Sequence, residues 1–165
     1  MKTDDLIYLA IGRVAVIWAE IEYTLDKCLS LIYDNCRGPI VQNDFPIAIS
    51  RKLHLLKQAL KTDRRLLPLV EDGKPIIESI IRFKQYRVKV LHGSVAGYTD
   101  SSVKFSVRTF SRRKSPSRKL PVYSRTVVRI DKIEKYGEEM DEFLFEFGAF
   151  STQLWRAFHV SRRNE

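Results

Sequence analysis

Two long runs of apolar residues, one near each end of the chain, recur in steps of three and four residues. This spacing places one apolar stripe along a helix, and it is the period of helical bundles and coiled coils. The sequence therefore predicts a first helix from about Thr3 to Tyr33 and a last helix that begins at Asp131, with both stripes in the core. The stripes consist of Ile7, Ile11, Val14, Trp18, Ile21, Leu25, Cys28 and Ile32, and of Ile133, Tyr136, Met140, Phe143, Phe147, Phe150, Leu154 and Phe158.

Two shorter amphipathic segments lie between these runs. One begins near Pro46 and carries Leu53, Leu56 and Leu60 on one face. The other follows a predicted turn at Asp72-Gly73, has Pro75 in its first turn, and ends at Gly93 as a C-terminal cap. Four amphipathic helices predict a predominantly all-α fold, an up-down bundle of four main helices. A length of 165 residues suits one domain, so we predict a single domain over 1–165.

The apolar pattern changes to a period of two before the last helix. Val103, Phe105 and Val107 alternate with polar residues, and the segment from Arg125 to Ile130 alternates in the same way. Two such runs are typical of a β-hairpin with one apolar face. We therefore predict a basic β-hairpin insertion over 97–130, with a long loop from Ser111 to Pro121.

This hairpin carries the chain's excess of positive charge. The net charge is +9, and the segment Ser101–Ile130 contains nine basic residues and no Asp or Glu. A basic surface with interleaved aromatic residues favours polyanion binding, although a purely solubilising face would have the same composition. The candidate RNA-binding residues are Arg108, Arg112, Arg113, Lys114, Arg118, Lys119 and Arg125.

Most catalytic signatures are absent from the sequence. It contains no H-E-x-x-H, C-x-x-C, P-loop, dinucleotide-binding glycine pattern or G-x-S-x-G. His54, His92 and His159 are scattered without ligand spacing, so we expect no metal and no cofactor. Two cysteines do not make a disulfide framework. No signal-peptide pattern and no apolar run of about 18 residues are present, which predicts a cytoplasmic protein without a membrane partner.

One constellation with chemical potential remains, at the end of the third predicted helix. Arg87 is followed after four residues by His92 and then by Gly93. Histidine carries protons near neutral pH, and arginine suits the charge that develops on a phosphate. Five residues on a regular helix separate side chains by about 140° and about 7.5 Å, so the pair converges only if the helix unwinds or if two chains pool their pairs. A structural reading stays open, in which Arg87 forms an ion pair and His92 faces the helix dipole.

The order of these features resembles the HEPN superfamily of small helical domains. The segment Trp18-Ala-Glu-Ile-Glu22 with Leu25 lies in the first helix, and Arg87 to Gly93 closes the third. A hairpin and an amphipathic last helix then follow. The resemblance covers nearly the whole chain, although many members have Asn directly after the Arg, where this chain has Val88.

The resemblance implies a metal-independent endoribonuclease, a toxin or defence effector, that cleaves RNA as a homodimer. Arg87 and His92 would be catalytic at a site composed by both chains, with the third helix near the dyad, and Glu22 is a candidate supporting residue. An antitoxin or another protein partner is part of this expectation. Two alternatives remain: a non-catalytic nucleic-acid-binding dimer that uses the same hairpin, and a protein-interaction dimer that needs neither the hairpin nor the Arg/His pair.

Overall fold

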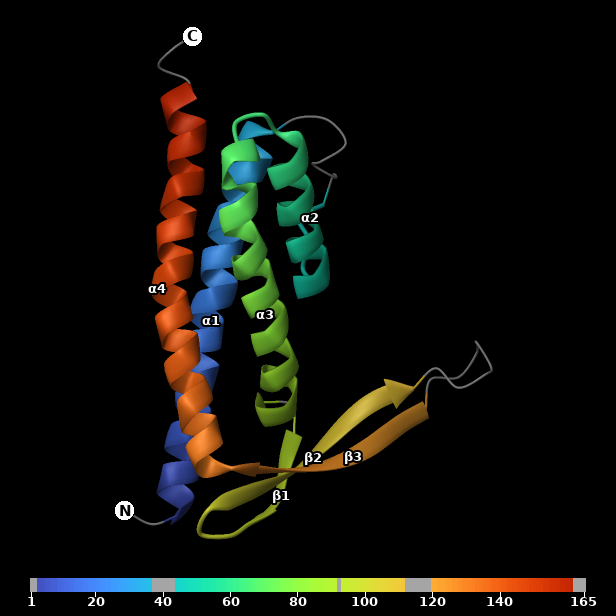
Figure 1. The fold of residues 1–165 in the computed structure, drawn as a ribbon. Helices are drawn as coiled ribbons and strands as arrows, with labels where there is room; N and C mark the ends of the chain where they lie inside the picture. Colours follow the sequence, from blue (N-terminus) through green and yellow to red (C-terminus); the bar gives the residue numbers. More distant parts are fainter. Residues whose placement is uncertain (1–2, 37–43, 92, 112–119, 162–165) are drawn as a thin grey trace. The chain divides into compact units, whose positions relative to one another are not determined.

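The computed structural model describes residues 3–36, 44–91, 93–111 and 120–161 (Figure 1). The fold is predominantly all-α, with four main helices and an antiparallel sheet inserted before the last helix, as predicted. The helices are α1 (Thr3–Asn35), α2 (Ile49–Thr62), α3 (Val70–Leu91) and α4 (Ile130–Ser161), with a short 3₁₀ turn η1 (Leu67–Leu69). The strands are β1 (Gly93–Tyr98), β2 (Ser102–Ser111) and β3 (Leu120–Arg129).

The chain divides into two compact units. Unit 1 comprises Met1–Trp18 and Arg82–Asp141, and unit 2 comprises Ala19–Ile81 and Glu142–Glu165. The helices α1, α3 and α4 therefore each contribute one part to each unit, whereas α2 belongs to unit 2 and the sheet to unit 1. The single domain over 1–165 stays a prediction.

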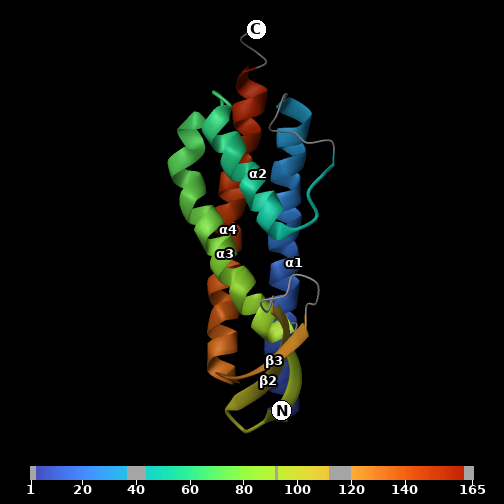
Figure 2. The ribbon, with the colours of Figure 1, turned by 90° about the vertical axis from the view of Figure 1, so that its right-hand side faces the viewer.

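In unit 2, α2 lies alongside the first half of α3 (Figures 1 and 2). Helix α3 begins at Val70, so the predicted turn at Asp72-Gly73 is wrong and Pro75 lies inside the helix. A Cβ on Gly73 would lie 2.5 Å from Leu60 Cδ1. Gly73 is therefore a packing residue that lets α3 approach α2. Helix α2 begins at Ile49, later than the predicted start near Pro46.

In unit 1, the predicted hairpin is present as β2 and β3, and β1 adds a third strand in the order β1-β2-β3. Helix α3 ends at Leu91, and Gly93 opens β1 opposite Val107, so the prediction of Gly93 as a helix cap is wrong. A Cβ on Gly93 would lie 2.6 Å from the carbonyl oxygen of Lys89 and 3.0 Å from Phe105 Cβ. Glycine at this position thus lets the chain pass from helix to strand against β2. The strands β2 and β3 extend together as an arm from the helical part of this unit (Figure 1).

Both predicted apolar stripes lie in the core. Every member is buried except Ile11 and Tyr136, which are half-buried. The predicted apolar face of the sheet is also confirmed, because Val103, Phe105 and Val107 are buried. In the described part of the chain, no helix combines the length and the apolar character needed to cross a membrane.

Candidate nucleic-acid interface

Arg87 lies over the ring of Trp18 within unit 1. Trp18 belongs to the core stripe of α1 and is 2% exposed. Arg87 is in the last turns of α3, and its guanidinium carbon is 5.3 Å from the centroid of the indole ring. A guanidinium at this distance from an indole face makes a favourable cation–π contact. The core of unit 1 therefore supports the cation from one side.

The guanidinium of Arg87 has no polar partner within the residues that the structure describes. Its Nε is buried without an acceptor, and no carboxylate among those residues pairs with it. The alternative in which Arg87 serves to form an ion pair within the chain thus lacks a partner among the described residues. Because a charged group that leaves water needs a counter-charge or hydrogen bonds, this cation is suited to receive an external anion.

Two neighbouring polar groups of unit 1 also lack a described partner. The indole Nε1 of Trp18 and the hydroxyl of Tyr86 are both buried without a hydrogen bond to any described residue. Tyr86 stacks on Tyr136 with ring centroids 3.6 Å apart, and burial, with Tyr136 beside it, raises the pKa of the Tyr86 hydroxyl. The buried polar atoms without a described partner in this unit are thus the Trp18 Nε1, the Tyr86 hydroxyl and the Arg87 Nε.

The second predicted catalytic residue, His92, lies outside the described residues. Its convergence with Arg87 stays a prediction. Glu22, the candidate supporting residue, is half-buried in unit 2, and no hydrogen bond or ion pair joins it to another described residue. Its role likewise stays a prediction.

The sheet presents a basic face to solvent. The register places Lys104 opposite Val127, Ser106 opposite Arg125 and Ser102 opposite Arg129. Residues directly opposite one another on antiparallel strands share a face. Lys104, Arg125 and Arg129 are exposed, whereas the alternating residues Val103 and Phe105 are buried on the other face. The period-two pattern thus separates an inner apolar face from an outer basic one.

Of the remaining predicted RNA-binding residues, Arg108 lies in the part of β2 that the structure describes. Arg108 is opposite Tyr123 in the register, two positions beyond the Ser106–Arg125 pair. Arg129 is held by Asp131 at 2.7 Å, so part of its charge is already neutralised. Five of the predicted residues lie outside the described residues: Arg112, Arg113, Lys114, Arg118 and Lys119.

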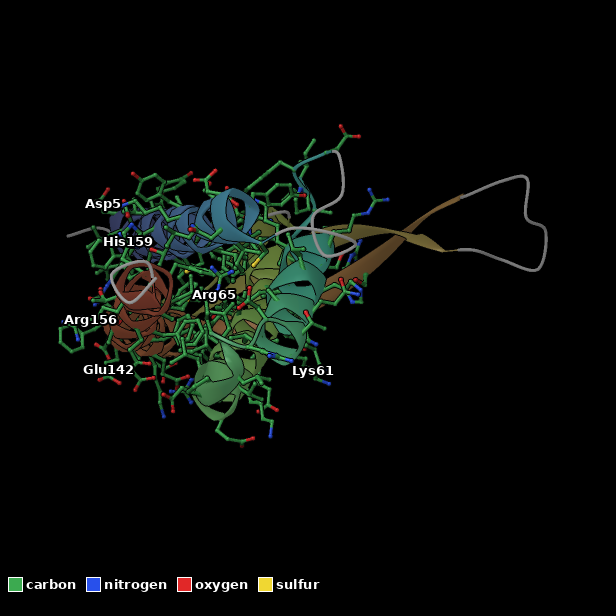
Figure 3. All side chains as sticks on the ribbon, turned by 90° about the horizontal axis from the view of Figure 1, so that it is seen from above. Asp5, Lys61, Arg65, Glu142, Arg156 and His159 are labelled. Atoms are coloured by element: carbon green, nitrogen blue, oxygen red, sulfur yellow. The ribbon has the colours of Figure 1, made fainter. Side chains whose placement is uncertain are left out.

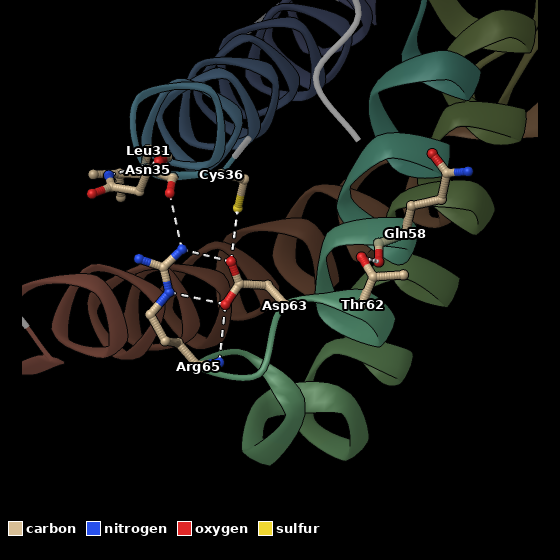
Figure 4. Close-up of polar contacts among 7 residues, drawn as sticks. All are labelled: Leu31, Asn35, Cys36, Gln58, Thr62, Asp63 and Arg65. Atoms are coloured by element: carbon tan, nitrogen blue, oxygen red, sulfur yellow. Dashed lines mark hydrogen bonds and ion pairs between the residues drawn. The ribbon is translucent and has the colours of Figure 1, made fainter. Parts of the chain in front are cut away.

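A polar cluster in unit 2 was not predicted from the sequence. Arg65 forms an ion pair with Asp63, and Asp63 accepts a hydrogen bond from the Cys36 thiol at 3.2 Å (Figure 4). Seen from above, Arg65 points inward between α1 and α4, whereas Lys61 and Arg156 point outward (Figure 3). Burial, with the Asp63 carboxylate beside it, raises the pKa of the Cys36 thiol to about 12. Since the thiolate is the nucleophile, this cysteine is not suited to nucleophilic catalysis at neutral pH.

A metal site is not found in the described ranges, where no three His, Cys, Asp or Glu side chains are grouped to hold an ion. The apolar period of the first helix assigned Trp18 to the core, and Trp18 was also one of the residues that carry the family resemblance. Its helical spacing carried no signal of a contact with Arg87, because the two residues belong to different helices.

Comparison of the chain with protein-family models, with curated proteins and with solved structures finds no match.

Proposed function

We propose that this protein is a metal-independent endoribonuclease of the HEPN type, which cleaves RNA with Arg87 and His92 at a site composed by two copies of the chain. The observation that carries the proposal is the Arg87 guanidinium, which rests on the buried Trp18 ring and has no anionic partner among the described residues. Such a supported, unpaired cation suits the phosphate at which an RNA strand is cut.

The proposed reaction uses the RNA's own 2′-hydroxyl as nucleophile. His92 takes the proton from this hydroxyl or gives one to the leaving oxygen, roles that imidazole performs near neutral pH. The 2′-oxygen forms a bond to phosphorus while the bond from phosphorus to the 5′-oxygen breaks. Arg87 holds the charge that builds on the phosphate oxygens. The products are a 2′,3′-cyclic phosphate and a 5′-hydroxyl end.

The outer face of the sheet supplies the binding surface in this proposal. Lys104 and Arg125 are exposed on that face, and Arg108 pairs in register with Tyr123 further along the same two strands. Contacts of lysine and arginine to phosphates give affinity that depends on salt and varies little with sequence. We therefore assign the arm a role in holding the RNA backbone.

Assembly into a homodimer is part of the same proposal. Arg87 and His92 do not face each other on one regular helix, and two chains related by a dyad bring two pairs together. Light scattering at high micromolar concentration should give twice the chain mass. A monomer at that concentration would contradict the composite site. A cytoplasmic toxin or defence effector, with an antitoxin or another protein as partner, is the biological setting we propose.

Cleavage of single-stranded RNA in EDTA tests the proposal. His92→Ala should lower the rate by about 10²–10⁴, the usual effect of losing a proton carrier. Arg87→Ala should lower it comparably, and Arg87→Lys should restore part, because a point charge does not replace a planar fork. The matched controls are His54→Ala, an exposed histidine of α2, and Arg82→Ala, which lies earlier on α3 beside Glu139. Cleavage that persists in His92→Ala would contradict the assignment.

A nucleic-acid-binding dimer without catalysis is the second candidate. The basic outer face of the sheet favours it, because that face needs no Arg87–His92 pair. The two candidates differ in one measurement. Wild-type protein that binds RNA and never cuts it would support the second candidate and remove the first.

A further inference from the structure

We propose that Trp18 is a positioning residue for Arg87 and holds its guanidinium in the orientation that binds an RNA phosphate. This inference rests on the proposed function only in taking Arg87 as a phosphate-binding group. Trp18 acts through Arg87, because the cation lies over the indole face at 5.3 Å and Trp18 itself is buried.

The need for a positioning residue follows from the surroundings of Arg87. Arginine has several rotatable bonds, and binding costs affinity when a long side chain must first be immobilised. In the part of the chain that the structure describes, no carboxylate or carbonyl oxygen fixes this guanidinium. The contact that the structure shows for this guanidinium is with the indole ring, and it limits where the cation can lie. A fixed plane matters because a guanidinium binds phosphate through two parallel N–H groups.

The indole N–H group distinguishes a role of Trp18 in positioning Arg87 from a role in filling the core. Trp18 Nε1 is buried and donates to no described residue. A buried donor without an acceptor lowers stability, and phenylalanine at the same position would carry no such donor. Packing alone therefore does not require tryptophan here. The larger π face does distinguish the two residues, since indole binds cations better than phenyl does.

The two roles make different predictions for Trp18→Phe. If Trp18 only fills the core, its replacement changes stability, and any effect on RNA affinity is independent of Arg87. If Trp18 positions Arg87, the fold is retained while affinity falls, and the fall disappears once Arg87 is removed. A double-mutant cycle measures this dependence directly.

The experiment uses a fluorescein-labelled 2′-O-methyl RNA oligonucleotide, which binds but has no 2′-hydroxyl for attack. Fluorescence anisotropy gives its Kd for wild type, Trp18→Phe, Arg87→Ala and the double variant. We expect Kd to rise about threefold for Trp18→Phe and about tenfold for Arg87→Ala, in line with cation–π and charged hydrogen-bond strengths. The double variant should match Arg87→Ala alone. Val14→Ala, which truncates a buried residue of the same α1 stripe, is the control and should leave Kd unchanged.

The inference would be overturned if the fold-changes in Kd of the two single variants multiplied in the double variant. It would also be overturned if Trp18→Phe left Kd unchanged, or if the wild-type protein did not bind the oligonucleotide. Should Trp18→Phe fail to fold, Trp18→Tyr completes the same cycle. Failure of the nuclease proposal is distinguishable, because coupling between Trp18 and Arg87 on this uncleavable RNA stands even if unmodified RNA is never cut.

Discussion

Arg65 holds both carboxylate oxygens of Asp63, with Nε 2.9 Å from Oδ1 and Nη2 2.6 Å from Oδ2. The same guanidinium donates to the backbone carbonyl of Asn35 at 2.9 Å, at the C-terminal end of α1. Asp63 directly follows α2 and also accepts the hydrogen bond of Cys36. The Arg65–Asp63 pair therefore joins the end of α2 to the end of α1 in unit 2.

Replacement of Arg65 by Ala should destabilise the protein. The Asp63 carboxylate is only 11% exposed and would lose its counter-charge, and the Asn35 carbonyl would lose a donor. We expect the free energy of unfolding to fall by about 2–3 kcal/mol, as for other charged groups left unpaired in partly buried sites. Urea denaturation at pH 7 measures it. Arg64→Ala, the exposed neighbour, should cost under about 0.5 kcal/mol, and equal losses in the two variants would contradict the account.

Acid should remove the stability that Asp63 contributes. Hydrogen bonds from Arg65 lower the pKa of the Asp63 carboxyl from 3.8 to about 2. A carboxyl whose pKa is lower in the folded state stabilises the fold above its unfolded pKa, and that contribution disappears as pH falls from about 4 to about 2. Its full size is about 2 kcal/mol. Urea denaturation at several pH values should show a flatter acid dependence for Asp63→Asn than for wild type, and identical profiles would disprove this role.

Three glycines should respond to alanine with opposite signs. A Cβ on Gly12 or Gly148 would meet nothing within 4 Å, so Ala there should raise the free energy of unfolding by about 0.5–1 kcal/mol through helix propensity. Ala at Gly93 would press on the Lys89 carbonyl and should cost about 1–3 kcal/mol, the usual range for overpacking. Thermal unfolding of the three variants checks the order. A stabilised Gly93→Ala would contradict the close passage from α3 to β1.

Removal of three charges from the predicted loop between Ser111 and Pro121 should weaken RNA binding evenly across sequences. The variant replaces Arg112, Arg113 and Lys114 by Ala. Each lost phosphate contact on a single strand should lower the slope of log K against log salt by about 0.7. The matched control removes the same charge from exposed residues of unit 2, through Lys57→Ala, Lys61→Ala and Arg64→Ala. Equal slopes for the two triple variants would exclude the predicted loop as part of the binding surface.

The helices were predictable because their apolar period repeats many times. The stripe from Ile7 to Ile32 has eight members, so the half-buried position Ile11 does not obscure the helical period. Strand β1 offered no such signal. Its Val95 is 46% exposed, and the strand exists through pairing with β2. Gly73 was misread for a related reason, since its helical role depends on the approach of Leu60 from another helix.

The candidate site was predictable only where residues are close in the sequence. The spacing of Arg87 and His92 drew attention to the end of α3, and the alternation around Lys104 predicted the basic outer face. The contact of Arg87 with Trp18 joins two helices and leaves no local pattern. The Cys36–Asp63 hydrogen bond is hidden for the same reason, because it forms only once α1 and α2 have packed.

The end groups of cleaved RNA test the central claim most directly. Single-stranded RNA is incubated with the protein in EDTA, and the fragments are identified by mass spectrometry. We expect 2′,3′-cyclic phosphate and 5′-hydroxyl ends with wild-type protein, and no fragments above background with His92→Ala or Arg87→Ala. Fragments that carry 5′-phosphate ends, or cyclic phosphates that form equally in His92→Ala, would contradict it.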